Sequence, residues 1–174
     1  MKSKESFDPH AVPIRSAATV MIVADRPDLQ VLMIERNSRM VFAGGMWVFP
    51  GGAVDAGEAD EFEPYCTGID DAQASASLGI DEDGLAYWVA AIRENFEEAG
   101  LLLGRRRDGK PLDLESLRPE RHALHAGQRS FLDIVRDNDL ILDTASVRYV
   151  AHWITPLGSP RRFSARFFVT SPPA

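Results

Sequence analysis

The chain has 174 residues and a mass of 19.2 kDa, enough for one domain and too little for two ordinary ones. With 45% hydrophobic and 26% charged residues, the composition is typical of a globular protein and not of a disordered one. No apolar run approaches the roughly 18 residues that cross a bilayer, and no secretory signal precedes the first predicted strand. The single Cys66 excludes an internal disulfide framework and a multi-cysteine zinc site, so we expect a reducing, cytoplasmic location.

The charge is unevenly distributed along the chain. Residues 1–100 contain 18 acidic and seven basic side chains, whereas residues 101–174 contain eight acidic and 12 basic ones, for a net charge of −7. A protein that binds duplex phosphates usually has a strongly basic face. An acidic centre beside a basic C-terminal third instead predicts a small anionic substrate held next to bound metal cations, with neither nucleic acid nor membrane as a partner.

The first half of the chain predicts a loose leader followed by short strands. We expect residues 1–15 to be flexible, residues 17–23 and 30–35 to form a hairpin across the turn-forming residues 25–28, and residues 46–49 to form a third strand that Pro50-Gly51-Gly52 ends. Residues 59–83 are acidic, rich in Ala and Ser and without a clear period. They predict a surface insertion with some local helix.

The second half begins with the clearest periodicity in the sequence. An apolar stripe at helical spacing predicts a helix over residues 84–100, with Gly100 at its C-terminal end; its members are Leu85, Trp88, Val89, Ile92, Phe96 and Ala99. Residues 105–110 predict a polar turn. Residues 119–138 predict a helix with a weak point at Gly127, and residues 146–154 and 163–169 predict strands. We expect a single domain over residues 16–174, in which residues 105–145 are a helical insertion.

Three carboxylates lie on the polar face of the helix over residues 84–100, at Glu94, Glu97 and Glu98. Carboxylates at this spacing repel one another, and a hard divalent cation such as Mg²⁺ or Mn²⁺, which prefers oxygen ligands, would compensate. Arg93 lies four residues before Glu97 and is within reach of a pair with it. Taken by itself, the helix is equally compatible with a solvated charged face.

The loop upstream of this helix supplies a second part of the pattern, because Gly52 precedes Glu58 by six residues. Together, loop and helix resemble the Nudix hydrolase signature G-x5-E-x7-R-E-U-x-E-E-x-G-U, in which U is bulky and apolar. The chain matches eight of its nine specified positions, at Gly52, Glu58, Arg93, Glu94, Glu97, Glu98, Gly100 and Leu101. It departs from the signature at Asn95 and in the spacer, which has 34 residues (59–92) in place of seven.

A split at this place resembles the Nudix branch of peroxisomal-type coenzyme A diphosphatases, and residues 46–52, 91–100, 151–156 and 160–168 resemble that branch as well. The resemblance implies an α/β fold, an α/β/α sandwich around a mixed sheet. Only residues 170–174 follow the last predicted strand, so we expect the C-terminal strand and helix of this fold to be lacking. We further expect an open apolar face beside residues 163–169, covered by a homodimer unless the chain is a shortened, weakly active form. The peroxisomal C-terminal signal is absent from Thr170-Ser171-Pro172-Pro173-Ala174.

The resemblance also implies the chemistry, in which water attacks a phosphorus of a nucleoside diphosphate linked to another moiety with the help of Mg²⁺ or Mn²⁺. Glu97 and Glu98 are the first-choice metal ligands, Glu94 is a ligand or the general base, and Glu58 contributes at the mouth of the loop. Arg93, Glu94 and Glu97 are the catalytic candidates. The glycines of the loop let the backbone fold tightly over the helix; they are Gly51, Gly52 and Gly57.

The substrate is less well defined by the sequence. Guanidinium groups suit phosphates, although solvated surface arginines explain the same residues; the candidates are Arg36, Arg39, Arg161, Arg162 and Arg166. The favoured substrate is coenzyme A or one of its thioesters. The alternatives are a pyrophosphatase of the NADH or ADP-ribose type and a non-catalytic Nudix-like module that binds such a metabolite.

Overall fold

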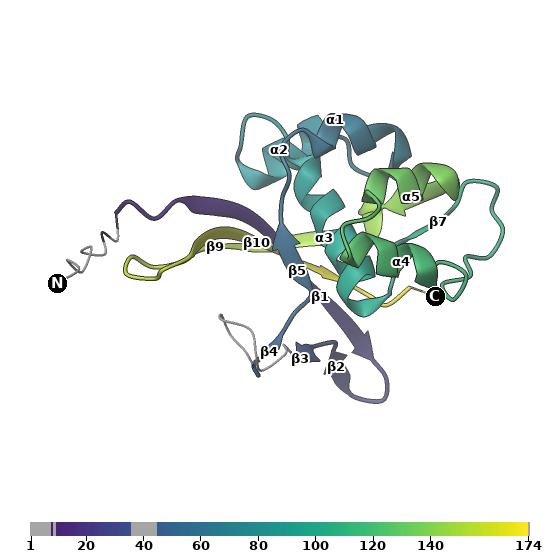
Figure 1. Ribbon diagram of the computed structural model, residues 1–174, viewed down its shortest axis with the longest axis horizontal. Coiled ribbons are helices and arrows are strands. Elements are labelled where there is room, and N and C mark those ends of the chain that lie inside the picture. The colour runs from purple at the N-terminus through teal and green to yellow at the C-terminus, as the bar shows by residue number, and fades with distance from the viewer. Residues whose placement is uncertain (1–7, 9, 36–44, 174) are drawn as a thin grey trace.

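A mixed sheet forms the centre of the chain in the computed structural model, which describes residues 8, 10–35 and 45–173 (Figure 1). The apolar run at residues 17–23 lies in β1 (Ile14–Asp25), which pairs with three other strands. These are β10 (Arg162–Thr170) in parallel, and β2 (Leu29–Val31) and β5 (Gly51–Ala53) antiparallel; β9 (Arg148–Ile154) pairs antiparallel with β10. The α/β class expected from the sequence is confirmed.

Helix α3 (Leu85–Ala99) packs on one face of this sheet. Its apolar stripe is buried as the period predicts, with Leu85, Val89 and Ile92 completely inaccessible. The helix ends at Gly100, whose φ of 74° is left-handed and whose N–H donates to the carbonyl of Phe96. Side chains of β1 and β10 that face α3, such as those of Val20 and Phe168, close the core from the other side.

Smaller elements surround α3. The remaining helical segments are α1 (Glu58–Phe62), η1 (Glu63–Tyr65), α2 (Asp71–Leu78), α4 (Arg118–His125), α5 (Phe131–Asp137) and η2 (Thr144–Ser146). Two small sheets complete the described structure, one of β3 (Ile34–Glu35) and β4 (Trp47–Val48), the other of β6 (Cys66–Thr67), β8 (Leu140–Asp143) and β7 (Gly104–Arg106). No helix of the described residues has the length and apolar character that crossing a membrane requires.

Most of residues 59–83 are exposed or partly exposed, and a few side chains anchor the segment to the core. Phe62 is 2% exposed and stacks on Phe131, with ring centroids 5.6 Å apart, and Ala74 and Leu78 are also buried. The sequence shows no stripe here because α1 and α2 are short and bury few, mostly small, side chains. That the segment is a surface insertion relative to other Nudix domains stays a prediction.

Three further predictions about local structure need correction. The helix expected over residues 119–138 is two helices, because Gly127 takes a φ of 66° between α4 and α5. The expected polar turn at residues 105–110 begins as strand β7, which pairs with the unpredicted strand β8. The glycines Gly51 and Gly52, expected only to end a strand, form most of β5. Short strands of this kind lack the alternation that sequence patterns need.

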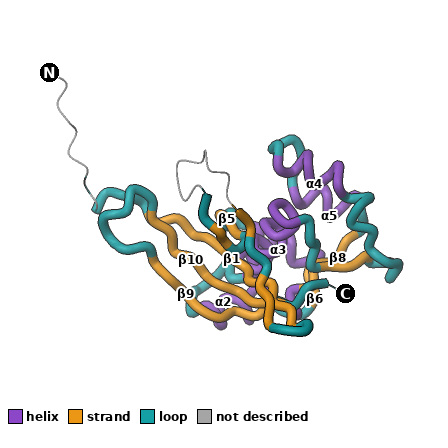
Figure 2. Tube along the Cα trace, turned by 90° about the horizontal axis from the view of Figure 1, so that it is seen from below, coloured by secondary structure: helices purple, strands orange, loops and turns teal. Residues whose placement is uncertain are grey.

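The face of the sheet away from α3 borders a groove of about 690 Å³, lined by strand and loop residues and by no helical residue in the described chain. Its walls include Trp47 and Trp153, which are 61% and 69% exposed. Ala165 and Phe167 of β10 form part of its floor. The open apolar face expected beside residues 163–169 is thus present. In both views, β1, β9 and β10 extend past the helices at one end of the molecule (Figures 1 and 2).

Candidate functional site

The loop with Gly51 and Gly52 meets the helix with the predicted carboxylates where β5 lies against α3. The Gly51 N–H donates a 3.1 Å hydrogen bond to Oε2 of Glu98. Gly52 lies against the carboxylate of Glu94 so closely that a Cβ atom at this position would overlap with it. Because no other residue lacks a Cβ, the second glycine is required for this close approach. The two glycines therefore contact two of the carboxylates that were predicted for the site, those of Glu98 and Glu94.

Arg93 joins the two separated parts of the signature. Its Nε lies 3.3 Å from Oε1 of Glu58, and its Nη1 donates a hydrogen bond to Oε1 of Glu94. Its Nη2 donates to the carbonyl of Ala53 at 2.8 Å and lies 3.6 Å from Oδ2 of Asp55. The side chain is 12% exposed, so Arg93 is a positioning residue that ties α3 to the loop.

The pair between Arg93 and Glu97 that their spacing favours is not formed in the described structure, because the guanidinium group is taken up by Glu58 and Glu94. Glu97 instead has Nδ1 of His125 3.3 Å from its Oε1. Arg121 donates to the backbone carbonyls of Glu97 and Glu98, both at 2.8 Å. A cation there compensates the exposed carbonyls at the end of a helix. Neither contact could be predicted, because α4 contains no recognisable motif.

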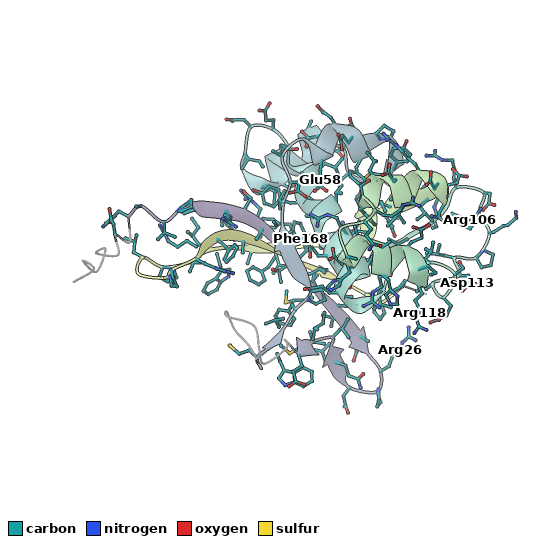
Figure 3. All side chains as sticks on the ribbon, in the orientation of Figure 1. Arg26, Glu58, Arg106, Asp113, Arg118 and Phe168 are labelled. Atoms are coloured by element: carbon teal, nitrogen blue, oxygen red, sulfur yellow. The ribbon has the colours of Figure 1, made fainter. Side chains whose placement is uncertain are left out.

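Glu58 is brought to the site by residues that the sequence did not single out. Gly57, with a φ of 83°, precedes α1, and the carboxylate of Asp83 accepts hydrogen bonds from the N–H groups of Gly57 and Ala59. Asp71 in turn accepts from the N–H of Asp83. The end of the long spacer thus binds the backbone at its beginning. Glu58 lies on the helical side of the sheet (Figure 3), where it pairs with Arg93.

Burial sets the electrostatics of the site. It raises the pKa of Glu94 to about 7, against the opposing effect of Arg93 and with the help of Glu97 and Glu98. Burial likewise raises the pKa of Glu58, although the charge of Arg93 opposes the shift. Burial disfavours the charge of Arg93 too, but its acidic neighbours outweigh that effect and raise its pKa. Four carboxyl groups, those of Glu58, Glu94, Glu97 and Glu98, thus lie near the single guanidinium group of Arg93.

The donor chemistry of this cluster fits a hard divalent cation. Oε2 of Glu58 is buried and has no hydrogen-bond partner among the described residues, which is the condition of a carboxylate oxygen that lacks a ligand. Carboxylate oxygens are the ligands that Mg²⁺ and Mn²⁺ prefer. In the arrangement described, no three potential metal-binding side chains converge closely enough to enclose an ion.

The structure separates the candidate arginines. Arg161 lines the groove on the open sheet face, and Arg162 lies beside it at the start of β10. Arg166 is 5% exposed on the other face, with its Cζ 4.4 Å from the ring centroid of Tyr87. It therefore shares no surface with Arg161. Arg36 and Arg39 lie outside the described residues.

The Asn95 departure from the signature has a local explanation. Asn95 is completely buried, and its amide nitrogen donates a hydrogen bond to the carbonyl of Leu101 beyond the end of α3. The buried amide nitrogen thereby has a hydrogen-bond partner, whereas the side-chain oxygen Oδ1 has none among the described residues. Phe96 next to it is buried in the core and close to Phe131.

Comparisons with known proteins place the chain in a family. The family model described as the NUDT19 Nudix domain matches residues 69–172. Acyl-coenzyme A diphosphatase NUDT19 of Gallus gallus is 29% identical over 213 residues, covering 91% of this chain and 56% of that protein. The human protein of the same name is 28% identical, covering 80% and 47%. Putative nudix hydrolase 7 of Caenorhabditis elegans is 30% identical, covering 89% and 43%.

A solved structure agrees as well. The crystal structure of a NUDIX hydrolase from Alicyclobacillus acidocaldarius matches with a TM-score of 0.72 and 28% identity, covering 92% of this chain and 71% of that one. The chain spans about half the length of the curated relatives it matches. Since the family model covers more than half of the chain, the chain belongs to the Nudix hydrolases, in the family of the NUDT19 Nudix domain.

Proposed function

We propose that the chain hydrolyses the diphosphate of coenzyme A or one of its thioesters. The observation that carries the proposal is the packing of the Gly51–Gly52 loop against the carboxylates of Glu98 and Glu94. The same two glycines line the groove on the open face of the sheet. A substrate in the groove therefore lies next to the loop that contacts the acidic cluster, by which we mean Glu58, Glu94, Glu97 and Glu98. The name acyl-coenzyme A diphosphatase, borne by the relatives from chicken and human, favours coenzyme A as the substrate.

The acidic cluster supplies the chemistry. Glu58, Glu94, Glu97 and Glu98 would hold Mg²⁺ or Mn²⁺, which when bound neutralises diphosphate oxygens and makes water more acidic. Arg93 orients Glu58 and Glu94 through its ion pairs. Glu94 acts either as a metal ligand or as the general base toward water, and the rise in its pKa caused by burial is compatible with the second role.

A panel of diphosphate compounds tests the proposal. The chain is incubated with coenzyme A, an acyl-coenzyme A, NADH and ADP-ribose, each with Mg²⁺, with Mn²⁺ or with a chelator, and the products are separated by chromatography. We expect coenzyme A to yield adenosine 3′,5′-bisphosphate and 4′-phosphopantetheine, with the fastest turnover of the panel for coenzyme A or its thioester and none in chelator.

The other outcomes distinguish the alternatives. Faster turnover of NADH or ADP-ribose would replace coenzyme A by a dinucleotide-type substrate. Binding of one compound without turnover of any would make the chain a metabolite-binding module. Turnover that persists undiminished in chelator would remove the metal from the proposal.

A further inference from the structure

Three arginines surround a second cavity, of about 330 Å³, next to the groove on the open sheet face. They are Arg15, Arg161 and Arg162, and they come together because β1 and β10 run in parallel with Ile14 opposite Arg162 and Arg15 opposite Phe163. The start of β1 and the loop between β9 and β10 accordingly lie side by side at the end of the sheet that extends past the helices (Figure 1).

The charge of this arginine pocket is uncompensated in the described part of the chain. None of the residues that line it is acidic, and none of its three arginines forms an ion pair with a described carboxylate. Arg162 is held in place by a 3.0 Å hydrogen bond from its Nε to the carbonyl of Thr155. Three arginines that line one small cavity suit a doubly charged anion, because a guanidinium group offers paired N–H donors to phosphate oxygens.

The arginine pocket and the groove are continuous, since Arg161 and Phe163 line both. The other end of the groove is the Gly51–Gly52 loop at the acidic cluster. Gly52 is opposite Ala18, which is opposite Arg166, four residues after Arg162. Two strand spacings and four residues along a strand correspond to about 16 Å between the backbones of Gly52 and Arg162. This span leaves room for one nucleoside between the loop and the guanidinium groups.

The groove between the two ends is apolar and aromatic, with Trp47 and Trp153 among its walls. The hydroxyl of Thr155, one of its few polar groups, is already engaged with the backbone of Phe163. Such a lining accepts a flat heterocycle by stacking and offers little to hydrogen-bond its edges. The charged groups at the two ends of the groove, the acidic cluster and the arginine pocket, would then distinguish one nucleotide from another.

We infer that Arg15, Arg161 and Arg162 bind a phosphate monoester on the nucleoside of a substrate whose diphosphate lies at the acidic cluster. The inference rests on the proposed function and narrows it: the enzyme selects nucleotides that carry a second, separate phosphate, as coenzyme A does and dephospho-coenzyme A does not. The arginine pocket determines specificity and takes no part in bond cleavage.

The test compares coenzyme A with dephospho-coenzyme A in the wild-type chain, in Arg161→Gln and in the double variant Arg15→Gln/Arg161→Gln. We expect the wild type to prefer coenzyme A at least about tenfold in kcat/KM, mainly through KM. The preference should shrink in the single variant and vanish in the double variant. Arg148→Gln, an exposed arginine of β9 at the opposite end of the β9–β10 pair, is the matched control and should keep the preference.

Equal turnover of the two compounds by the wild type would overturn the inference and leave the proposed function intact. So would a preference that survives in the double variant. If no diphosphate is hydrolysed at all, a binding measurement tests the arginine pocket independently of the proposed function. Titration calorimetry should then show adenosine 3′,5′-bisphosphate binding at least about tenfold more tightly than AMP, with the difference lost in the double variant, and equal affinities would refute the arginine pocket.

Discussion

At the scale of single residues, Gly52 shows how the signature constrains the backbone and not only the side chains. The space that a Cβ would fill is occupied by the Glu94 carboxylate. Arg93 then fixes the same carboxylate from the other side. Gly52 thus contacts a carboxylate about 40 residues further along the chain, and the arginine that precedes this glutamate holds the carboxylate as well. Because the three residues share one contact, we expect changes to them to be coupled.

Gly52→Ala is therefore expected to lower activity with little loss of fold. The added methyl group must displace Glu94 or bend β5, and a displacement of this kind costs about tenfold or more in kcat. Coenzyme A turnover and the thermal midpoint would be measured together. Ala56→Ser, an exposed position of the same loop, is the control and should change neither quantity. A fully active alanine variant would show that Glu94 tolerates a different position.

Glu97→Gln should remove most of the activity while the protein stays folded. Glu97 lies on the polar face of α3, away from the core side chains of Ile92 and Phe96. Loss of one anionic ligand is expected to cost about a hundredfold in kcat, or about 2.7 kcal/mol of barrier. Turnover at saturating Mg²⁺ is the measurement, and Glu61→Gln on the exposed side of α1 is the matched control. Unchanged turnover in Glu97→Gln would exclude this residue from the site.

At the scale of elements, the parts of the fold that the sequence predicts are those with a long, regular pattern. The stripe of α3 and the apolar runs of β1 and β10 each bury a continuous face, and such faces produce a period. Strand β8 has a short apolar run, yet its partners β6 and β7 are two and three residues long and come from distant parts of the chain. Pairing of this kind depends on tertiary contacts and leaves no local signal.

The same contrast holds within the candidate site. Glu94, Glu97 and Glu98 could be grouped from sequence because helical spacing alone places them on one face. Asp83 could not, because its role depends on the chain returning to the N–H groups of Gly57 and Ala59. Its φ of 63° is a backbone conformation that only the folded structure reveals.

The anchoring of residues 59–83 by Phe62 leads to a prediction about stability. Phe62→Ala should cost about 3–5 kcal/mol of unfolding free energy, as truncation of a buried aromatic side chain usually does, because Phe62 is 2% exposed and stacks on Phe131. Urea denaturation followed by circular dichroism measures the change. Glu61→Ala, its exposed neighbour on α1, should cost less than about 0.5 kcal/mol. A small effect of the Phe62 change would show that this contact does not anchor the segment to the core.

At the scale of the whole molecule, the chain has two unlike faces. The helical face of the sheet is covered by α3 and carries the acidic cluster at its edge with the glycine loop. The opposite face is the apolar groove, with the arginine pocket at its far end. The two faces meet at Gly51 and Gly52, which line the groove on one side and contact Glu98 and Glu94 on the other.

An open apolar face of this kind also favours association with a second copy of the chain. We expect weak self-association through the groove face at high concentration, because Trp47, Trp153 and Ile154 are each more than half exposed there. Sedimentation velocity over a range of concentrations measures it. Trp153→Ser should abolish the association, whereas Leu29→Ser, which replaces a 71% exposed side chain on β2 outside the groove lining, should leave it unchanged. Adenosine 3′,5′-bisphosphate should weaken the association, since ligand and second copy would compete for one surface. A sedimentation coefficient that does not change with concentration would show that the homodimer expected from the sequence does not form through this face.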